Sequence, residues 1–289
     1  MDSALKAGRR MLDSFVGRST PWLEILVHAR FSELCLLTEQ GAEAHRHLLI
    51  SLAAMDRVGP WPDNIGLRWA LALACLQMGE FDEAQRWTEA AERDTVDEQY
   101  DTASYAMALK AEIRLGRGDV DGGLELWRRV FDQRVAARDP LFRIEPAGLD
   151  PWMLEAQSVA VVAHARHGRT EAIAPLGDSL PARVAAMLEP PGTRRPPFLM
   201  DQPIVGSLLL ALSMVDIARG ANRSGARLVA MSERFRVLRG FQPTMSSTLA
   251  RAAAREADGP AYDDDASSYA GLDRAGLRAA ALAALAERP

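Results

Sequence analysis

The chain has 289 residues, of which 48% are hydrophobic and only 6% aromatic. This hydrophobic content is sufficient for a folded core and excludes a disordered protein, and the abundance of Ala and Leu favours helices over sheets. The net charge of −5 argues against a nucleic-acid-binding surface that covers the whole molecule. No apolar run approaches the ~20 residues of a membrane-spanning helix, and no signal peptide is recognisable, so we expect a cytoplasmic protein.

Residues 2–58 predict three helices. The first covers 2–17. Thr20 followed by Pro21 is a favourable start for the second, because Thr is a common N-cap and proline suits the first helical position. The second and third helices meet at Gly41, which we expect to form the turn of an antiparallel helical hairpin.

The clearest hairpin pattern lies in Leu67–Arg93. Apolar residues recur every three or four positions as far as Met78, which indicates a helix with one buried face. Gly79 suits a left-handed helix cap, and the same periodicity resumes at Phe81. Ala84 is small, as expected where the two helices cross. The stretch therefore predicts a second hairpin.

This hairpin resembles the tetratricopeptide (TPR) repeat. The residues that match the repeat are Leu71, Ala72, Gly79, Phe81, Ala84 and Ala91. Arg68 stands where the repeat usually has Trp. The resemblance implies that successive hairpins stack and that their first helices line a concave groove.

The remaining sequence predicts further helices separated by glycine turns at Gly118, Gly168 and Gly220. The predicted helices are 98–115, 120–137, 151–167, the short 170–176 and 181–188, then 203–219, 221–238, 243–256 and 273–287. An acidic loop is expected at 258–267. No segment alternates with a period of two, so we predict an all-α fold without a sheet, an α-solenoid of about 12–14 helices in TPR-like hairpins.

Three regions are predicted along the chain. Residues 1–188 form the TPR-like helical hairpin array, and 203–289 form C-terminal hairpins that complete the solenoid. Between them, 189–202 contains four prolines and a glycine, which cannot continue a helix, so this stretch is predicted to be a loop or hinge.

The C-terminal part resembles the end of the TPR-like region of large actinobacterial transcription regulators, of the SARP and large LuxR-type families. The matching residues are Gly225, Arg227, Leu228, Arg236 and Gly240, followed by Tyr262, Gly271 and an Ala-rich last helix. Members of these families also carry a DNA-binding domain, and many carry an ATPase module. This chain has neither a GxxxxGK[ST] loop nor a basic recognition helix. The resemblance thus implies a regulatory portion of such a protein, or a stand-alone relative, that binds neither ATP nor an operator.

Metal sites are not expected from the sequence. His164 and His167 are three apart, but no further ligand accompanies them, which favours a role at the helix C-terminus. His45 and His47 are two apart and face different sides of a helix. Asp263–Asp265 lacks the spacing of Ca²⁺ or Mg²⁺ ligands and is interpreted as solvated.

Catalytic residues and cofactors are not expected either. Cys35 and Cys75 lie within apolar helical faces, which is typical of small buried hydrophobes. No nucleophile elbow or paired-carboxylate motif occurs.

Two basic stretches leave alternatives open. Six arginines between residues 219 and 239 would suit DNA or an acidic partner domain, although an exposed helix face is the favoured interpretation. Arg194 and Arg195 lie between proline pairs and would suit a partner, although a plain connector is favoured.

The TPR pattern predicts which side chains face the groove. The candidates are His28, Phe31, Trp69, Gln77, Tyr105, Glu112, Glu155 and Arg166, with core packing favoured for Leu73, Leu210 and Met214. This mixed aromatic and sparsely charged set suits a peptide, a helix of another domain or a small amphipathic ligand.

We therefore expect a non-enzymatic protein-interaction or effector-sensing domain of a bacterial transcription regulator. Its expected partner is a protein or peptide, such as the regulator's own DNA-binding or ATPase domain, or a small-molecule effector, with no direct contact to nucleic acid or membrane. The alternative is a stand-alone TPR receptor for a peptide or small molecule. An all-α enzyme is the least favoured hypothesis.

Overall fold

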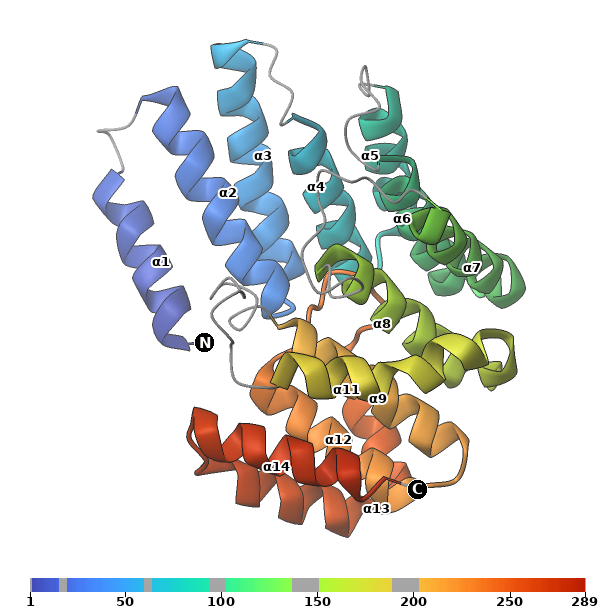
Figure 1. Ribbon diagram of the computed structural model, residues 1–289. Coiled ribbons are helices and arrows are strands. Elements are labelled where there is room, and N and C mark those ends of the chain that lie inside the picture. Colours follow the sequence, from blue (N-terminus) through green and yellow to red (C-terminus); the bar gives the residue numbers. More distant parts are fainter. Residues whose placement is uncertain are drawn as a thin grey trace. The chain divides into compact units, whose positions relative to one another are not determined.

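The structure, a computed structural model, describes residues 2–15, 20–59, 64–93, 102–136, 151–188 and 203–288. Every regular element in these ranges is a helix, which confirms the all-α prediction (Figure 1). The predicted proline-rich hinge at 189–202 lies outside the described residues. Among the helices described, none combines the length and the apolar character that crossing a bilayer requires.

The chain folds into two compact units. Unit 1 comprises Met1–Val130 together with the short segment Arg239–Pro243. Unit 2 comprises Phe131–Leu238 and Thr244–Pro289.

Unit 1 is a series of helices that pack in the order of the sequence. The helices are α1 (Asp2–Phe15), α2 (Pro21–Leu37), α3 (Gly41–Val58), α4 (Asn64–Met78), α5 (Phe81–Arg93), α6 (Thr102–Gly116) and α7 (Val120–Ala136), whose last residues belong to unit 2. From α1 to α6, consecutive helices contact each other; in addition, α2 contacts α4, and α4 contacts α6. The first helices of successive pairs therefore lie side by side.

The glycine turns of unit 1 are confirmed in two cases and corrected in a third. Gly79 and Gly118 have φ values of 76° and 84°, the left-handed conformation expected of a helix cap. The prediction for Gly41 is wrong, because Gly41 is the first residue of α3 and Glu39 has the positive φ of that turn. A Cβ on Gly41 would lie 2.7 Å from Cβ of Gln77, so glycine here permits the close approach of α3 to α4.

Small residues lie at helix crossings in both units, as predicted for Ala84. Ala84 is fully buried in unit 1. In unit 2, a Cβ on Gly225 would lie 2.4 Å from Cγ1 of Ile217 and 2.9 Å from the carbonyl oxygen of Ser213. A larger side chain at either position would separate the two helices.

Unit 2 is built around one buried helix. Its elements are α8 (Pro151–Arg166), a 3₁₀ helix (Thr170–Ile173), α9 (Ala174–Leu188), α11 (Ile204–Ala218), α12 (Asn222–Phe235), α13 (Ser247–Ala270) and α14 (Arg274–Ala286). Helix α11 contacts α8, α9, α12 and α13, and every residue from Ile204 to Asp216 is buried. A helix that is apolar on all sides requires such a central place.

The acidic loop predicted at 258–267 is wrong. This stretch belongs to α13, and the backbone leaves helical geometry only at Asp258. The Asp258 carboxylate accepts a hydrogen bond from the Ala261 amide at 3.1 Å, and Pro260 occupies the first helical turn, where its missing N–H costs nothing. Asp258 thus ends one helical segment and caps the next.

The two short helices predicted at 170–176 and 181–188 are also corrected. Only Thr170–Ile173 forms a separate element, a 3₁₀ turn, and α9 then continues through Pro181.

Candidate functional site

The segment Arg239–Pro243 packs into unit 1 although more than a hundred residues separate it from the neighbouring helices in the sequence. Gln77 on α4 donates one Nε2 hydrogen bond to the Arg239 carbonyl oxygen at 2.9 Å and another to the Leu36 carbonyl oxygen at 2.8 Å. A Cβ on Gly240 would lie 3.2 Å from Leu73 Cδ1. The segment therefore lies directly against the side of α4 that carries Leu73 and Gln77.

Phe241 fixes the segment in an aromatic cluster made of Trp69, Tyr105, Trp127 and Phe241. The Phe241 ring centroid lies 5.6 Å from that of Tyr105 and 5.4 Å from that of Trp127. Trp69 and Tyr105 are 4.6 Å apart. These separations are favourable for aromatic pairs, and Phe241 is almost completely buried.

Two side chains next to this cluster complete the contacts. Gln242 donates from Nε2 to the Glu39 carboxylate at 3.0 Å. Glu112, a predicted groove residue, is fully buried and accepts a hydrogen bond from Trp127 Nε1 at 2.8 Å. Its carboxylate therefore orients the indole that packs on Phe241.

Helix α4 also carries two polar atoms without hydrogen-bond partners. Trp69 Nε1 and Gln77 Oε1 are both buried, and neither has a partner among the described residues. Buried polar atoms in folded proteins are normally satisfied by protein, water or a ligand. Among the described residues, one donor and one acceptor on α4 therefore have no partner within the protein.

His28, another predicted groove residue, forms a hydrogen-bonded pair with His47 on α3. Their Nδ1 atoms are 2.7 Å apart, and Arg46 Nη2 lies 3.2 Å from His47 Nε2. Since arginine can only donate, His47 Nε2 accepts, and the proton of neutral His47 is on Nδ1, from which it donates to His28. Burial, followed by the neighbouring His28, lowers the pKa of His47 to about 4. The pair is therefore neutral at pH 7.

The rings of Phe31 and His47 are nearly perpendicular, with an interplanar angle of 80° and a centroid distance of 4.8 Å, and Phe31 is fully buried. A Cβ on Gly8 of α1 would lie 2.6 Å from the Phe31 ring. Phe31, which belongs to α2, therefore packs between α1 and α3 as part of the core of unit 1.

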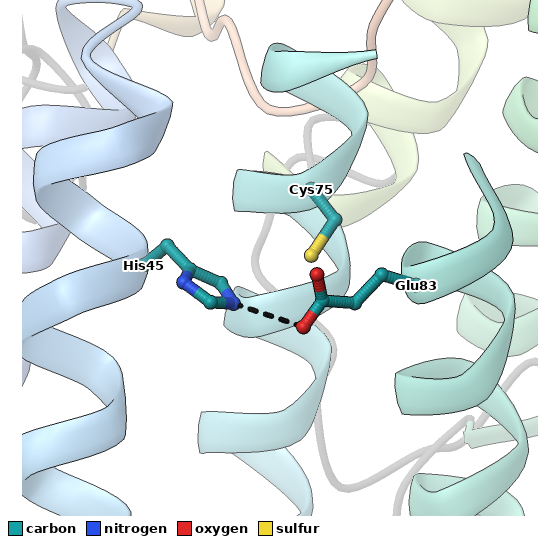
Figure 2. A group of neighbouring side chains, drawn as sticks. All are labelled: His45, Cys75 and Glu83. Atoms are coloured by element: carbon teal, nitrogen blue, oxygen red, sulfur yellow. Dashed lines mark ion pairs between the residues drawn. The ribbon is translucent and has the colours of Figure 1, made fainter. Parts of the chain in front are cut away.

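A cluster that the sequence did not predict joins three successive helices: His45 on α3, Cys75 on α4 and Glu83 on α5 (Figure 2). The His45 nitrogen, the Cys75 sulfur and a Glu83 oxygen lie within 4.8 Å of one another, and His45 Nε2 is 3.4 Å from Glu83 Oε1. Burial, followed by Glu83 and Glu80, raises the pKa of Cys75 to about 12. In the absence of a bound cation, Cys75 is thus a neutral thiol.

The remaining predicted groove residues belong to unit 2. Glu155 and Arg166 lie on α8, both half-buried, and Arg166 Nη2 donates to the Ser246 carbonyl oxygen at 3.3 Å. His164 on the same helix is buried, with Nδ1 2.8 Å from the Ala160 carbonyl oxygen. The structure therefore places six of the eight predicted residues in unit 1 and two in unit 2.

The sequence matches no protein-family model, and neither a curated protein nor a solved structure is significantly similar to it. The resemblance to regulator TPR-like regions therefore depends on the motif residues alone.

Proposed function

We propose that unit 1 is a non-enzymatic, TPR-like binding module for an extended polypeptide segment that carries a large aromatic side chain. The observation that carries this proposal is the contact of Arg239–Pro243 with α4, α6 and α7. The module would serve as the interaction or effector-sensing part of a bacterial transcription regulator.

The packing order of unit 1 supports a solenoid of TPR-like hairpins. Consecutive helices touch, first helices lie side by side, and Gly79 and Gly118 cap their helices in the left-handed conformation. In such a stack the first helices form a continuous surface that can take a chain segment. Arg239–Pro243 contacts this surface through Leu73 and Gln77 of α4 and Tyr105 of α6.

The contacts of Arg239–Pro243 are of the kinds by which a peptide is recognised. One main-chain carbonyl is bound by Gln77, one aromatic ring is inserted among aromatic side chains, and one polar side chain is held by Glu39. A buried aromatic anchor usually provides most of the affinity in such a site. We infer that a partner segment with the same chemistry binds by displacing this internal one.

The internal segment would set a threshold for that partner. Because Arg239–Pro243 is covalently attached, it competes at an effective concentration of roughly millimolar order. A partner therefore succeeds only if it binds more tightly or is itself held nearby.

Two side chains of unit 1 that are often used in catalysis have pKa values far from neutrality. The thiol of Cys75 has its pKa raised to about 12, so it is no nucleophile at neutral pH. The pKa of His47, lowered to about 4, makes that imidazole a poor base.

A peptide-binding experiment tests this proposal. A fluorescent peptide with the sequence of residues 236–246 is added to the wild-type chain and to Phe241→Ala, and anisotropy is measured. We expect at least ~10-fold tighter binding to Phe241→Ala, where the aromatic anchor of the competitor is missing. A peptide in which alanine replaces this phenylalanine should not bind.

Two further variants keep the result interpretable. Gln242→Ala removes the hydrogen bond of the internal segment to Glu39 without emptying the aromatic cluster or changing the binding surface, and it is used if Phe241→Ala fails to fold. Phe235→Ala, on α12 of unit 2, is the matched aromatic control and should leave peptide binding at the wild-type level. If the peptide binds no folded variant, Arg239–Pro243 is a structural connection only, and the proposal is wrong.

The second candidate is a stand-alone receptor for a small molecule, which the unpaired Trp69 Nε1 and Gln77 Oε1 favour. Native mass spectrometry would then show a retained mass that is lost in Trp69→Phe, because phenylalanine keeps a ring but has no N–H donor. Retention of the mass in that variant would exclude Trp69 as the donor.

A further inference from the structure

The cluster of His45, Cys75 and Glu83 has the composition of a transition-metal site. It offers an imidazole nitrogen, a sulfur and a carboxylate oxygen, each from a different helix of unit 1 (Figure 2). Zn²⁺ is bound by these three kinds of donor, whereas Mg²⁺ and Ca²⁺ require oxygen ligands throughout. The donor set therefore selects a borderline or soft divalent cation.

The distances suit tetrahedral coordination after small side-chain rotations. Zn–ligand bonds of about 2.0–2.3 Å place neighbouring donor atoms about 3.3–3.8 Å apart. His45 Nε2 and Glu83 Oε1 are already 3.4 Å apart, and all three donor atoms lie within 4.8 Å of one another. Cys75 therefore has to approach by at most about 1.5 Å, which rotation about side-chain bonds provides.

The environment of the three donors also favours a cation. His45 Nε2 is buried and forms no hydrogen bond within the described part of the chain, despite its closeness to Glu83. Cys75 is fully buried, and its sulfur is directed toward the Glu83 carboxylate (Figure 2). The charged groups that influence this sulfur are two carboxylates, of Glu83 and Glu80, and one cation, Arg86, so its surroundings carry a net negative charge.

We propose that His45, Cys75 and Glu83 bind one Zn²⁺ ion, with a water molecule as fourth ligand. On binding, the Cys75 thiol loses its proton to solvent, and neutral His45 coordinates through Nε2 while its proton is on Nδ1. The Glu83 side chain is one-third exposed, which gives the ion and the water access. The only net change is the gain of Zn²⁺ and the loss of one proton.

The ion would join two successive hairpins. His45 belongs to the hairpin α2–α3, whereas Cys75 and Glu83 belong to α4–α5. Zn²⁺ that binds only the folded chain should raise its melting temperature in proportion to the logarithm of the free metal concentration. This inference does not depend on the peptide-binding proposal.

The test uses the full chain without a histidine tag, freed of metal by a chelator and then titrated with Co²⁺. A site with one thiolate should give a sulfur-to-cobalt charge-transfer absorption that saturates at one equivalent, and Zn²⁺ should abolish it. Competition with a chromogenic chelator measures the Zn²⁺ affinity, for which we expect a Kd of about 1 μM or lower.

Variants assign the ligands. Cys75→Ser should lose the absorption, and His45→Gln and Glu83→Gln should each weaken Zn²⁺ binding by more than the roughly 10–100-fold typical of second-shell changes. Cys35→Ser is the matched control, because Cys35 is also fully buried but belongs to no such cluster among the described residues. It should keep both the absorption and the affinity.

Three outcomes would overturn the proposal: no charge-transfer absorption, an absorption that Cys35→Ser removes, or an affinity that His45→Gln and Glu83→Gln leave unchanged. Far-ultraviolet circular dichroism establishes that each variant is folded. If Cys75→Ser does not fold, the two partly exposed positions His45 and Glu83 still decide the question.

Discussion

The two units use helices in contrasting ways. In unit 1, each helix contacts mainly its neighbours in sequence, and polar side chains such as His28, His45 and Gln77 lie between helices. In unit 2, α11 is buried along nearly its whole length and touches four other helices. The candidate binding residues of unit 1 therefore lie at interfaces between its helices.

Buried polar groups have a different role in unit 2. Asp216 on α11 is almost fully buried and is bound by Arg288 through Nε at 2.9 and 3.0 Å and through Nη2 at 2.6 Å. Ser224 donates a further hydrogen bond at 2.7 Å. Every oxygen of this carboxylate is engaged, so the group stabilises the unit and has no capacity left for a ligand.

The largest expected effect is that of Gly206→Ala, which tests whether unit 2 depends on its central helix. The new Cβ would lie 1.5 Å from the Arg236 carbonyl oxygen and 2.8 Å from that of Ser232, both backbone atoms that side-chain rotation cannot move. We expect a loss of more than about 4 kcal/mol in the free energy of unfolding, measured by urea denaturation. Gly177→Ala on α9 is the control, since its nearest neighbour would be 3.8 Å away. Equal stability of the two variants would contradict the role of α11.

Next in size is the loss of Arg288. Arg288→Ala leaves the Asp216 carboxylate buried without its cation, which should cost about 3–5 kcal/mol. The exposed pair of Arg219 and Asp178 is the comparison, because Arg219→Ala should cost no more than about 1 kcal/mol. Urea denaturation of both variants measures the difference. Similar losses in the free energy of unfolding would mean that the buried pair stabilises the protein no more than the exposed pair does.

A pH-dependent effect is expected in unit 1. The unfolded chain binds the His47 proton near pH 6.5, whereas the folded chain binds it only near pH 4, so stability is complete above pH 6.5 and falls as pH decreases toward 4. The expected loss in the free energy of unfolding is on the order of 2–3 kcal/mol. The nearby charges of Arg46 and Arg9 lower the pKa of His47 further and so increase this loss of stability, whereas Glu43 raises the pKa and reduces the loss. Denaturation at pH 7.5 and 4.5 should show a smaller difference for His47→Leu than for the wild type. An unchanged difference would assign the effect to other groups.

The smallest expected effect on stability is that of Gly66→Ala in unit 1, where, unlike at Gly206 in unit 2, there is space for a side chain. Gly66 on α4 is exposed, and a Cβ there would meet no atom within 4 Å. Gly66→Ala should therefore raise the free energy of unfolding by about 0.5 kcal/mol through helix propensity alone. A measurable loss in thermal or urea denaturation would show that this position is not free.

Local features of the fold could be predicted because each depends on a short stretch of chain. The left-handed caps at Gly79 and Gly118 and the crossing at Ala84 all follow from residue type and spacing. The errors arose where two local signals compete. At Asp258 and Pro260, the same residues that end a helix also begin one, and the sequence pattern did not decide between a loop and a kinked helix.

The all-helical class could be predicted from the sequence because helical periodicity shows which residues form each buried face. Most helix ends could be predicted as well, because capping residues and glycines mark them. The sequence did not determine which faces meet. Gln77 binds a carbonyl 162 positions away, and His45, Cys75 and Glu83 converge from three helices. Only the tertiary structure decided these contacts, because the packing of helices depends on the shapes of whole faces and not on the spacing within any one of them.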